Sequence, residues 1–164
     1  MARVEAIVIA ASAGEPLVTV DRAELLPGIG IAGDRYALRL GHWSDPRWPD
    51  QELTLFEAEV AERLDLDPIA MRRNVVTRGV RLRDLIGQRF AIGSCEAIGV
   101  RACDPCGYIE RFTRKGLLAL LGEDGGLRAT IVRGGVIQRA DAIAVIATAP
   151  GREAAGASVS SAHP

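Results

Sequence analysis

Short runs of alternating or β-branched residues, separated by glycine and proline turns, constrain the fold of this chain most strongly. The runs that predict strands cover residues 3–9, 17–25, 75–77, 90–92, 97–102, 127–132 and 136–146. The glycines at 134–135 predict a hairpin turn between the last two of them. Predicted strands outnumber predicted helices, and most connections are short. The sequence therefore predicts a mostly β protein, with a β-barrel-like core and a few flanking α-helices.

Two segments carry helix signals. Thr54 and Glu57 have the spacing of a capping box, which predicts a helix from Thr54 to about Leu66. Residues 108–121 are helical in composition, and Gly116 is expected to kink or break that helix. The helices are therefore expected to be short and to flank the strands.

A loop at residues 41–49 follows a glycine-rich stretch that matches Gly-x-Gly-x-x-Gly at 28–33. The match is not a dinucleotide-binding fingerprint, because the fingerprint requires a helix after the last glycine. The loop holds His42, Trp43 and Trp48. Two interpretations stay open: a lid or wall over a ligand, or a surface loop whose tryptophans fold back onto the protein.

The length of 164 residues suits one domain, expected at residues 1–149. Residues 150–164 are rich in Ala, Ser and Gly and are predicted to be a disordered tail. The formal net charge of −1 gives no electrostatic case for nucleic-acid or membrane binding. Three cysteines cannot form a complete disulfide framework, so we expect a cytoplasmic protein with reduced thiols.

Two of the cysteines, Cys103 and Cys106, are spaced Cys-x-x-Cys. Asp104 is a suitable N-cap and Pro105 suits the first helical position, so the sequence predicts Cys106 in the first turn of a helix. Free backbone N–H groups and the positive end of a helix dipole would favour a thiolate there, and a thiolate is a nucleophile and a sulfur carrier. The alternative is that Cys106, like most cysteines, is a small buried hydrophobic residue.

Two arginine-containing motifs precede these cysteines. The run Arg72-Arg73-Asn74 can hold an anion by charge and bidentate hydrogen bonds, or it can be a solvated basic corner. The pair Asp34-Arg35 can take part in the same site, or it can be a local ion pair that fixes a turn. Lys115 is the only lysine among the 20 basic residues, which makes a Schiff-base role for this chain unfavourable.

The motifs follow one another in a recognisable order. They are Gly-x-x-Gly-Asp-Arg-Tyr (30–36), Leu-Thr-Leu-Phe-Glu (53–57), Arg-Arg-Asn-Val-Val-Thr-x-Gly (72–79), Ile-Gly-x-Arg-Phe-x-Ile-Gly (86–93), Asp-Pro-Cys (104–106) and Gly-Gly (134–135). In this order they resemble the MOSC domain, the module at the C-terminus of molybdenum cofactor sulfurases. The module also occurs in small stand-alone bacterial proteins and in amidoxime-reducing enzymes. The resemblance extends from about Gly28 to Ala144, and Arg-Arg-Asn and Pro-Cys are its most specific parts.

The resemblance implies a barrel similar to the pyruvate-kinase barrel, binding of the molybdenum cofactor (molybdopterin), and sulfur or oxo-group chemistry at that cofactor. Cys106 would accept sulfur as a persulfide or coordinate molybdenum through its thiolate. The protein would then be a sulfur carrier or transferase, or a molybdenum-dependent oxidoreductase. The other positions that match the family's cofactor-binding motifs are Asp34, Arg35, Arg72, Arg73, Asn74 and Thr77.

The chain departs from the family pattern in two respects. It has Ala140-Asp141 where the family usually has Gly-Asp. It also lacks the desulfurase-like domain of the fused enzymes, and pyridoxal phosphate belongs to that domain, so none is expected here. A cysteine desulfurase or a molybdoenzyme is therefore the implied partner.

Three other functions compete with this prediction. Cys103 and Cys106 resemble a thioredoxin-type Cys-x-Pro-Cys and would serve a thiol–disulfide oxidoreductase. A structural zinc site would need Cys95 and the two distant histidines in addition. A non-catalytic carrier of the molybdenum cofactor would keep the arginines and tolerate loss of the Cys106 thiol.

Overall fold

The computed structural model describes residues 1–48 and 50–148. Its strands are β1 (Arg3–Ile9), β2 (Val18–Val20), β3 (Arg22–Leu26), β4 (Gly30–Ile31), β5 (Leu53–Glu57), β6 (Val75–Arg78), β7 (Arg89–Ile92), β8 (Cys95–Ala102), β9 (Leu127–Arg133), β10 (Gly135–Gln138) and β11 (Ile143–Val145). Its helices are α1 (Ala58–Arg63), α2 (Gly107–Glu110) and α3 (Leu117–Leu121), with 3-10 turns η1 (Pro68–Met71) and η2 (Leu82–Leu85). The tail predicted at residues 150–164 lies outside the described residues.

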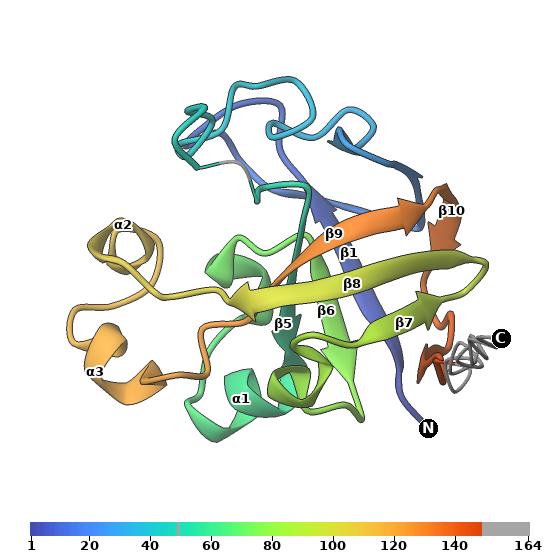
Figure 1. Cartoon of the computed structure of the whole chain (residues 1–164). Coiled ribbons are helices and arrows are strands. Elements are labelled where there is room, and N and C mark those ends of the chain that lie inside the picture. The colour runs from blue at the N-terminus through green and yellow to red at the C-terminus, as the bar shows by residue number, and fades with distance from the viewer. Residues whose placement is uncertain (49, 149–164) are drawn as a thin grey trace, which may run out of the picture.

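The strands form two sheets (Figure 1). The larger has the order β11-β7-β8-β9-β5-β6-β1-β2, and the smaller has the order β10-β3-β4. Neighbouring strands are antiparallel except β5 and β6, which are parallel. The backbone N–H groups of Ala140 and Ile143 donate to the carbonyls of Val4 and Ala2, both at 2.9 Å, and bring the β11 edge back beside β1. The larger sheet is therefore barrel-like, and the prediction of a mostly β protein with a few helices is confirmed.

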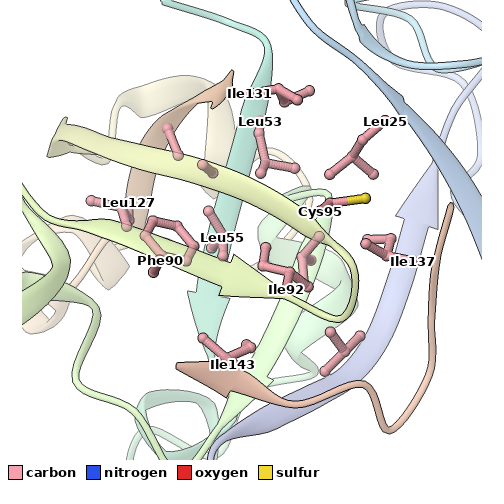
Figure 2. Packing of buried hydrophobic residues seen from close by; sticks show 14 of the residues in the cluster. Leu25, Leu53, Leu55, Phe90, Ile92, Cys95, Leu127, Ile131, Ile137 and Ile143 are labelled. Atoms are coloured by element: carbon pink, nitrogen blue, oxygen red, sulfur yellow. The ribbon is translucent and has the colours of Figure 1, made fainter. Parts of the chain in front are cut away.

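Alternate side chains of the strands fill the interior of the curled sheet. Phe90 and Ile92 on β7 and Leu53 and Leu55 on β5 are fully buried there and face one another (Figure 2). Burial of each such side chain contributes about 1.5–3 kcal/mol relative to exposure. This core stabilises the barrel-like sheet, and none of the expected site residues belongs to it.

Strand β5 shows where local sequence signals failed. The helix predicted from Thr54 begins only at Ala58, and its N-cap Glu57 makes no side-chain cap hydrogen bond. Residues 53–57 form a buried strand instead. One face joins the barrel core, and Phe56 on the other face packs in a second apolar cluster with residues of α1, η1, α2 and α3. The prediction was wrong because burial on both faces outweighed the capping signal.

The hairpin predicted at Gly134–Gly135 is also wrong. β9 pairs with β5 and β8 in the larger sheet, whereas β10 pairs with β3 in the smaller one. A Cβ atom on Gly134 would lie 2.5 Å from the Leu25 carbonyl oxygen. The glycines therefore let the chain cross closely from one sheet to the other.

Other local predictions agree with the structure in part. β7 and β8 pair as expected through the turn at 93–94. The helical segment at 108–121 is divided into α2 and α3, with Gly116 in a left-handed conformation as the N-cap of α3. The strand predicted at 17–25 is divided at Asp21, because β2 pairs with β1 and β3 pairs with β10. Among the described residues, every helix is too short or too polar to cross a membrane.

Candidate functional site

A pocket of about 190 Å³ lies where β8 ends and α2 begins, against the loop at 41–48. We call it the arginine pocket, and its lining residues are Arg35, Tyr36, Trp43, Trp48, Gln51, Arg72, Arg73, Arg101, Asp104, Pro105, Cys106, Tyr108, Ile109 and Arg128. It brings together four of the seven expected catalytic and cofactor-binding residues, namely Cys106, Arg35, Arg72 and Arg73. The other three, Asp34, Asn74 and Thr77, do not line it.

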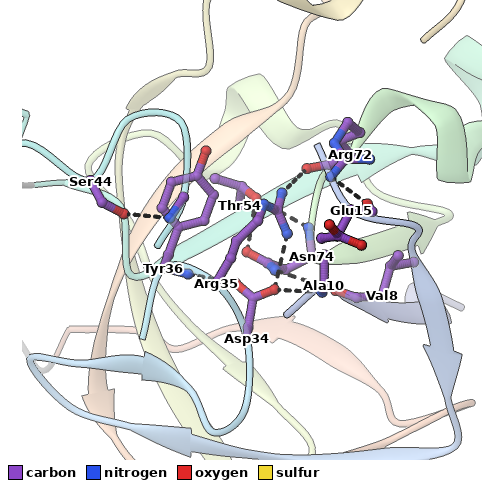
Figure 3. A network of polar contacts seen from close by, with 11 residues as sticks. Val8, Ala10, Glu15, Asp34, Arg35, Tyr36, Ser44, Thr54, Arg72 and Asn74 are labelled. Atoms are coloured by element: carbon purple, nitrogen blue, oxygen red, sulfur yellow. Dashed lines mark hydrogen bonds and ion pairs between the residues drawn. The ribbon is translucent and has the colours of Figure 1, made fainter. Parts of the chain in front are cut away.

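Asp34 and Arg35 form a buried ion pair at the base of the pocket (Figure 3). The Arg35 Nη1 donates to Asp34 Oδ1 at 2.9 Å, and the same oxygen accepts from the backbone N–H of Ala10 at 3.1 Å. Asp34 Oδ2 accepts from the backbone N–H of Tyr36 at 3.2 Å. Arg35 Nη2 donates to the carbonyl of Arg72 at 2.8 Å. This pair therefore joins the turn after β4 to the end of β1 and to the Arg72 backbone.

Arg72 sits in a constrained position. It is the only one of the family-matched arginines with a left-handed backbone, at φ 57° and ψ 31°, and it ends η1. A non-glycine residue in this conformation costs about 1 kcal/mol or more, and the hydrogen bond from Arg35 to its carbonyl holds it there. Its Nη2 donates to the Glu15 carbonyl at 3.0 Å, and its guanidinium lies 4.4 Å from the centre of the Phe112 ring. Burial and the neighbouring Arg35 lower the pKa of Arg72.

The side chains of Asn74 and Thr77 are fully buried and form hydrogen bonds with groups on neighbouring strands. Asn74 donates from Nδ2 to the Val8 carbonyl at 3.3 Å and accepts at Oδ1 from the Thr54 hydroxyl at 3.0 Å. Thr77 donates its hydroxyl to the Phe56 carbonyl at 3.3 Å. These two residues, like Asp34, hold strands β1, β5 and β6 in place beneath the pocket, and direct contact of any of the three with a cofactor stays a prediction.

Cys106 lines the pocket, but not in the first turn of a helix. It is the N-cap residue of α2, with extended backbone at φ −133° and ψ 167°, and α2 has only four residues. The helix was predicted to begin two residues too early, because Asp104 and Pro105 are not helical and the N-cap is Cys106 instead of Asp104. A Cβ atom on Gly125 would lie 2.3 Å from the Cys103 carbonyl oxygen and 2.7 Å from Pro105 Cδ. Gly125 therefore lets the following strand approach the segment that positions the thiol, a contact the sequence analysis did not identify.

The three cysteines lie in different surroundings. Cys106 is partly exposed, whereas Cys95 and Cys103 are buried and neither lines the pocket. Burial raises the pKa of the Cys95 thiol, which packs in the barrel core. Within residues 1–48 and 50–148, no three His, Cys, Asp or Glu side chains are grouped as a metal site would require. The zinc-site alternative therefore has no support in the described residues.

Arg101 and Arg128 are pocket residues that sequence analysis missed. They are cross-strand partners on β8 and β9, and like charges placed opposite each other destabilise a sheet. Arg101 is balanced by Asp50, whose Oδ2 accepts from Arg101 Nε at 2.5 Å. Arg128 donates Nη1 to the Gln51 side chain. Only the register of two strands distant from the Arg-Arg-Asn motif shows that these arginines belong to the site.

Aromatic side chains close the other side of the pocket. Trp43 and Trp48 pack edge to face at 5.8 Å, and the His42 ring stacks on Tyr108 at 3.8 Å. Tyr108 belongs to α2, two residues after Cys106, so the loop lies against the segment that carries the thiol. Because Trp43 and Trp48 of this loop line the pocket, the structure favours the interpretation of the tryptophans as a wall over a ligand.

Tyr36 is a further pocket residue that the sequence analysis included only as part of a motif. Burial raises the pKa of its phenol, and the nearby Arg35, Arg73 and Arg128 act in the opposite direction. The Arg35 guanidinium lies 4.7 Å from the centre of its ring. Tyr36, Trp48 and Gln51 also line a second hollow of about 500 Å³, so the two hollows adjoin.

The charges of the pocket fit an anionic ligand. Five arginines and a single aspartate line it, and among the described residues Arg72, Arg73 and Arg128 have no acidic partner. Arg72 and Arg128 are 6% and 7% exposed, and the Nε of each is buried without a hydrogen-bond acceptor. Guanidinium groups bind phosphate through paired hydrogen bonds, and a thiolate is a soft ligand for sulfur or molybdenum chemistry. The residues present therefore fit a phosphate-bearing cofactor with a reactive metal or sulfur centre.

Comparisons with known proteins agree with this architecture. The family model of the MOSC domain matches residues 48–144. No curated protein sequence matches the chain. The fold is similar to that of YuaD from Bacillus subtilis, with a TM-score of 0.69 and 18% identity over 87% of this chain and 94% of that chain.

Two further solved structures share the fold. YiiM from Geobacillus stearothermophilus has a TM-score of 0.66 and 14% identity, over 90% of this chain and 76% of that chain. YiiM from Escherichia coli has a TM-score of 0.62 and 17% identity, over 91% of this chain and 72% of that chain.

The family model spans more than half of the chain and contains the Arg-Arg-Asn and Pro-Cys motifs. The chain therefore belongs to the MOSC domain family.

Proposed function

We propose that this protein binds the molybdenum cofactor in the arginine pocket and that the Cys106 thiolate carries sulfur there or acts on the bound cofactor. One observation carries the proposal. Cys106 lines the same pocket as five arginines, three of which have no acidic partner among the described residues. A phosphate in the pocket would accept hydrogen bonds from guanidinium groups that line it, and the thiol would then lie beside the bound molecule.

The residues take separate roles in this proposal. Arg72, Arg73 and Arg128 bind the anionic part of the cofactor, because they have no acidic partner among the described residues. Arg35 lines the pocket but is paired with Asp34, so it holds the Arg72 backbone as well. Asn74 and Thr77 are positioning residues that keep the strands beneath the arginines aligned. When bound, the cofactor would supply a molybdenum centre for sulfur or oxo-group chemistry.

The position of Cys103 favours this function over thiol–disulfide exchange. Cys103 is 1% exposed, and its backbone N–H is bonded to the Gly126 carbonyl at 2.8 Å. A redox pair needs a second thiol that can reach the first and then be resolved by a partner. Cys106 alone is both partly exposed and in the pocket. A non-catalytic carrier of the cofactor would use the same arginines and is separated from sulfur carriage by experiment.

The experiment compares Cys106→Ala with Cys103→Ala in cells that make the molybdenum cofactor. Bound molybdenum and pterin are assayed, and persulfide is trapped at each cysteine. Sulfur carriage predicts that Cys106→Ala loses the persulfide while Cys103→Ala keeps it. A disulfide that either variant abolishes would indicate thiol–disulfide exchange, and pterin retained by both variants without any persulfide would indicate a carrier. Wild-type protein that holds neither pterin nor sulfane sulfur would refute the proposal.

A further inference from the structure

The arginine pocket also contains the elements of a sulfur-loading reaction. A sulfur carrier must receive sulfur in an activated form, and release of sulfur from an amino acid by a Schiff-base cofactor requires a lysine. The only lysine of the chain, Lys115, does not line the pocket. Sulfur must therefore reach Cys106 already activated, either from a partner or from a small molecule that the pocket itself recognises.

The pocket favours a small molecule whose leaving group is an oxyanion. Arg128 and Arg101 face each other across β8 and β9, and only Arg101 is neutralised by a carboxylate. Arg72, Arg73 and Arg128 line the pocket and have no acidic partner among the described residues. Donors that are fixed in place before reaction stabilise charge that develops on oxygen in a transition state. The oxygens of a sulfonate or sulfite group would accept from these guanidinium groups as phosphate oxygens do.

We infer that Cys106 takes sulfur directly from thiosulfate or a related thiosulfonate bound by these arginines. The Cys106 thiolate attacks the sulfane sulfur and forms a new S–S bond. The bond between that sulfur and the sulfonate sulfur breaks, and sulfite leaves with the electron pair of the broken bond. Cys106 becomes a persulfide anion, the total charge is unchanged, and no external oxidant or reductant is required.

The inference rests on the proposed sulfur carriage and adds the chemical class of the donor. A phosphate-bearing cofactor would compete with thiosulfate for the same guanidinium groups. Loading would therefore precede cofactor binding, and added inorganic phosphate should slow the loading of Cys106 by thiosulfate. Such competition distinguishes recognition by the arginines from a random reaction of an exposed thiol.

The test uses the purified full-length chain with thiosulfate labelled in its sulfane sulfur. Wild-type protein should release sulfite and gain one sulfur atom on the Cys106 peptide, and Cys106→Ser should do neither. Arg128→Gln should lower the second-order rate constant for loading by thiosulfate ~100- to 1,000-fold, the range for loss of an oxyanion donor. Arg133→Gln, on the same strand but exposed and paired with Glu96, is the matched control and should react like wild type. Arg73→Gln is the second variant if Arg128→Gln does not fold.

A parallel reaction supplies sulfur from a cysteine desulfurase and cysteine. Cys106 loaded by the desulfurase but not by thiosulfate would overturn the inference and leave the proposed function intact. Failure of both donors to load Cys106 would refute sulfur carriage as well. Equal loss of rate in Arg128→Gln and Arg133→Gln, or a loading rate unaffected by phosphate, would show that the arginines do not recognise the donor.

Discussion

Two groups of polar side chains, one buried and one only partly buried, lie next to each other in this protein and differ in how fully they are hydrogen-bonded. The support network consists of Asp34, Arg35, Thr54, Asn74 and Thr77, whose polar side chains bind one another and the backbone. The pocket wall consists of Arg72, Arg73, Arg101, Arg128 and Cys106. Two of its arginines keep a buried Nε without an acceptor, whereas no atom of the support network does so among the described residues.

The difference separates residues that hold the fold from residues that we propose to bind a ligand. A buried polar group without a partner costs roughly 1–3 kcal/mol, so it persists where a function requires it. Arg72, Arg73 and Asn74 are consecutive in the sequence, yet the first two line the pocket and the third joins β1 to β6. A single motif therefore contains both kinds of residue.

Replacement of Asp34 tests the support network and should have the largest effect. Asp34→Ala leaves the buried Arg35 guanidinium without its carboxylate and should lower the free energy of unfolding by about 3–5 kcal/mol. Denaturant unfolding measures the loss. Glu123→Ala, which breaks an exposed pair with Arg83, is the control and should cost about 1 kcal/mol or less. Equal losses in the two variants would contradict a structural role for the buried pair.

Replacement of Arg128 tests the pocket wall and should affect ligand affinity more than stability. Arg128→Met removes one unsatisfied donor together with the hydrogen bonds to Gln51 and the Asp50 carbonyl, so the free energy of unfolding should fall by less than in Asp34→Ala. The affinity for inorganic phosphate should fall by about 1.5–3 kcal/mol, the usual contribution of a hydrogen bond to a charged group. Calorimetric titration measures the affinity, with Arg133→Met as the control. A strong loss of stability together with unchanged affinity would place Arg128 in the support network instead.

The tryptophan loop should make a smaller contribution to the pocket wall. Replacing Trp43 and Trp48 by Ala together should reduce ligand affinity by about 0.5–1.5 kcal/mol, the additional energy of aromatic contacts. Unfolding should change little, since Trp48 is 45% exposed. Titration of the double variant with the ligand that wild type binds is the measurement. Unchanged affinity and turnover would support the alternative interpretation, a surface loop whose tryptophans fold back onto the protein.

Acid titration should reveal the smallest effect, at the rim of the pocket. Burial would raise the pKa of Asp50, but its ion pair with Arg101 outweighs burial and holds the pKa below the ordinary 3.8. The pair therefore stabilises the fold above that value, and its contribution is lost as the pH falls through the lowered pKa. Asp50→Asn should show a weaker dependence of unfolding free energy on pH in this acid range than wild type. Identical pH profiles would show that the pair does not contribute.

Prediction from the sequence succeeded where local patterns and tertiary contacts agree. The alternating residues of β7 and β8 formed the expected pair, and Gly116 divided the helical segment as expected. It failed at Thr54, where a capping box lies in a strand that is buried on both faces. It also failed at the 134–135 turn, because pairing of β10 with β3 depends on residues more than 100 positions earlier.

The amino-acid sequence by itself determined the short alternating strands, the two arginines at 72–73 and the thiol at 106, because period and side-chain chemistry are local properties. Tertiary structure alone decided that Arg101 and Arg128 face each other beside that thiol, since strand register sets their positions. It also decided that Asp34 and Asn74 lie beneath the pocket and Arg72 in its wall. The physical reason is that burial and hydrogen-bond satisfaction depend on segments that are distant in the chain and meet only in the fold.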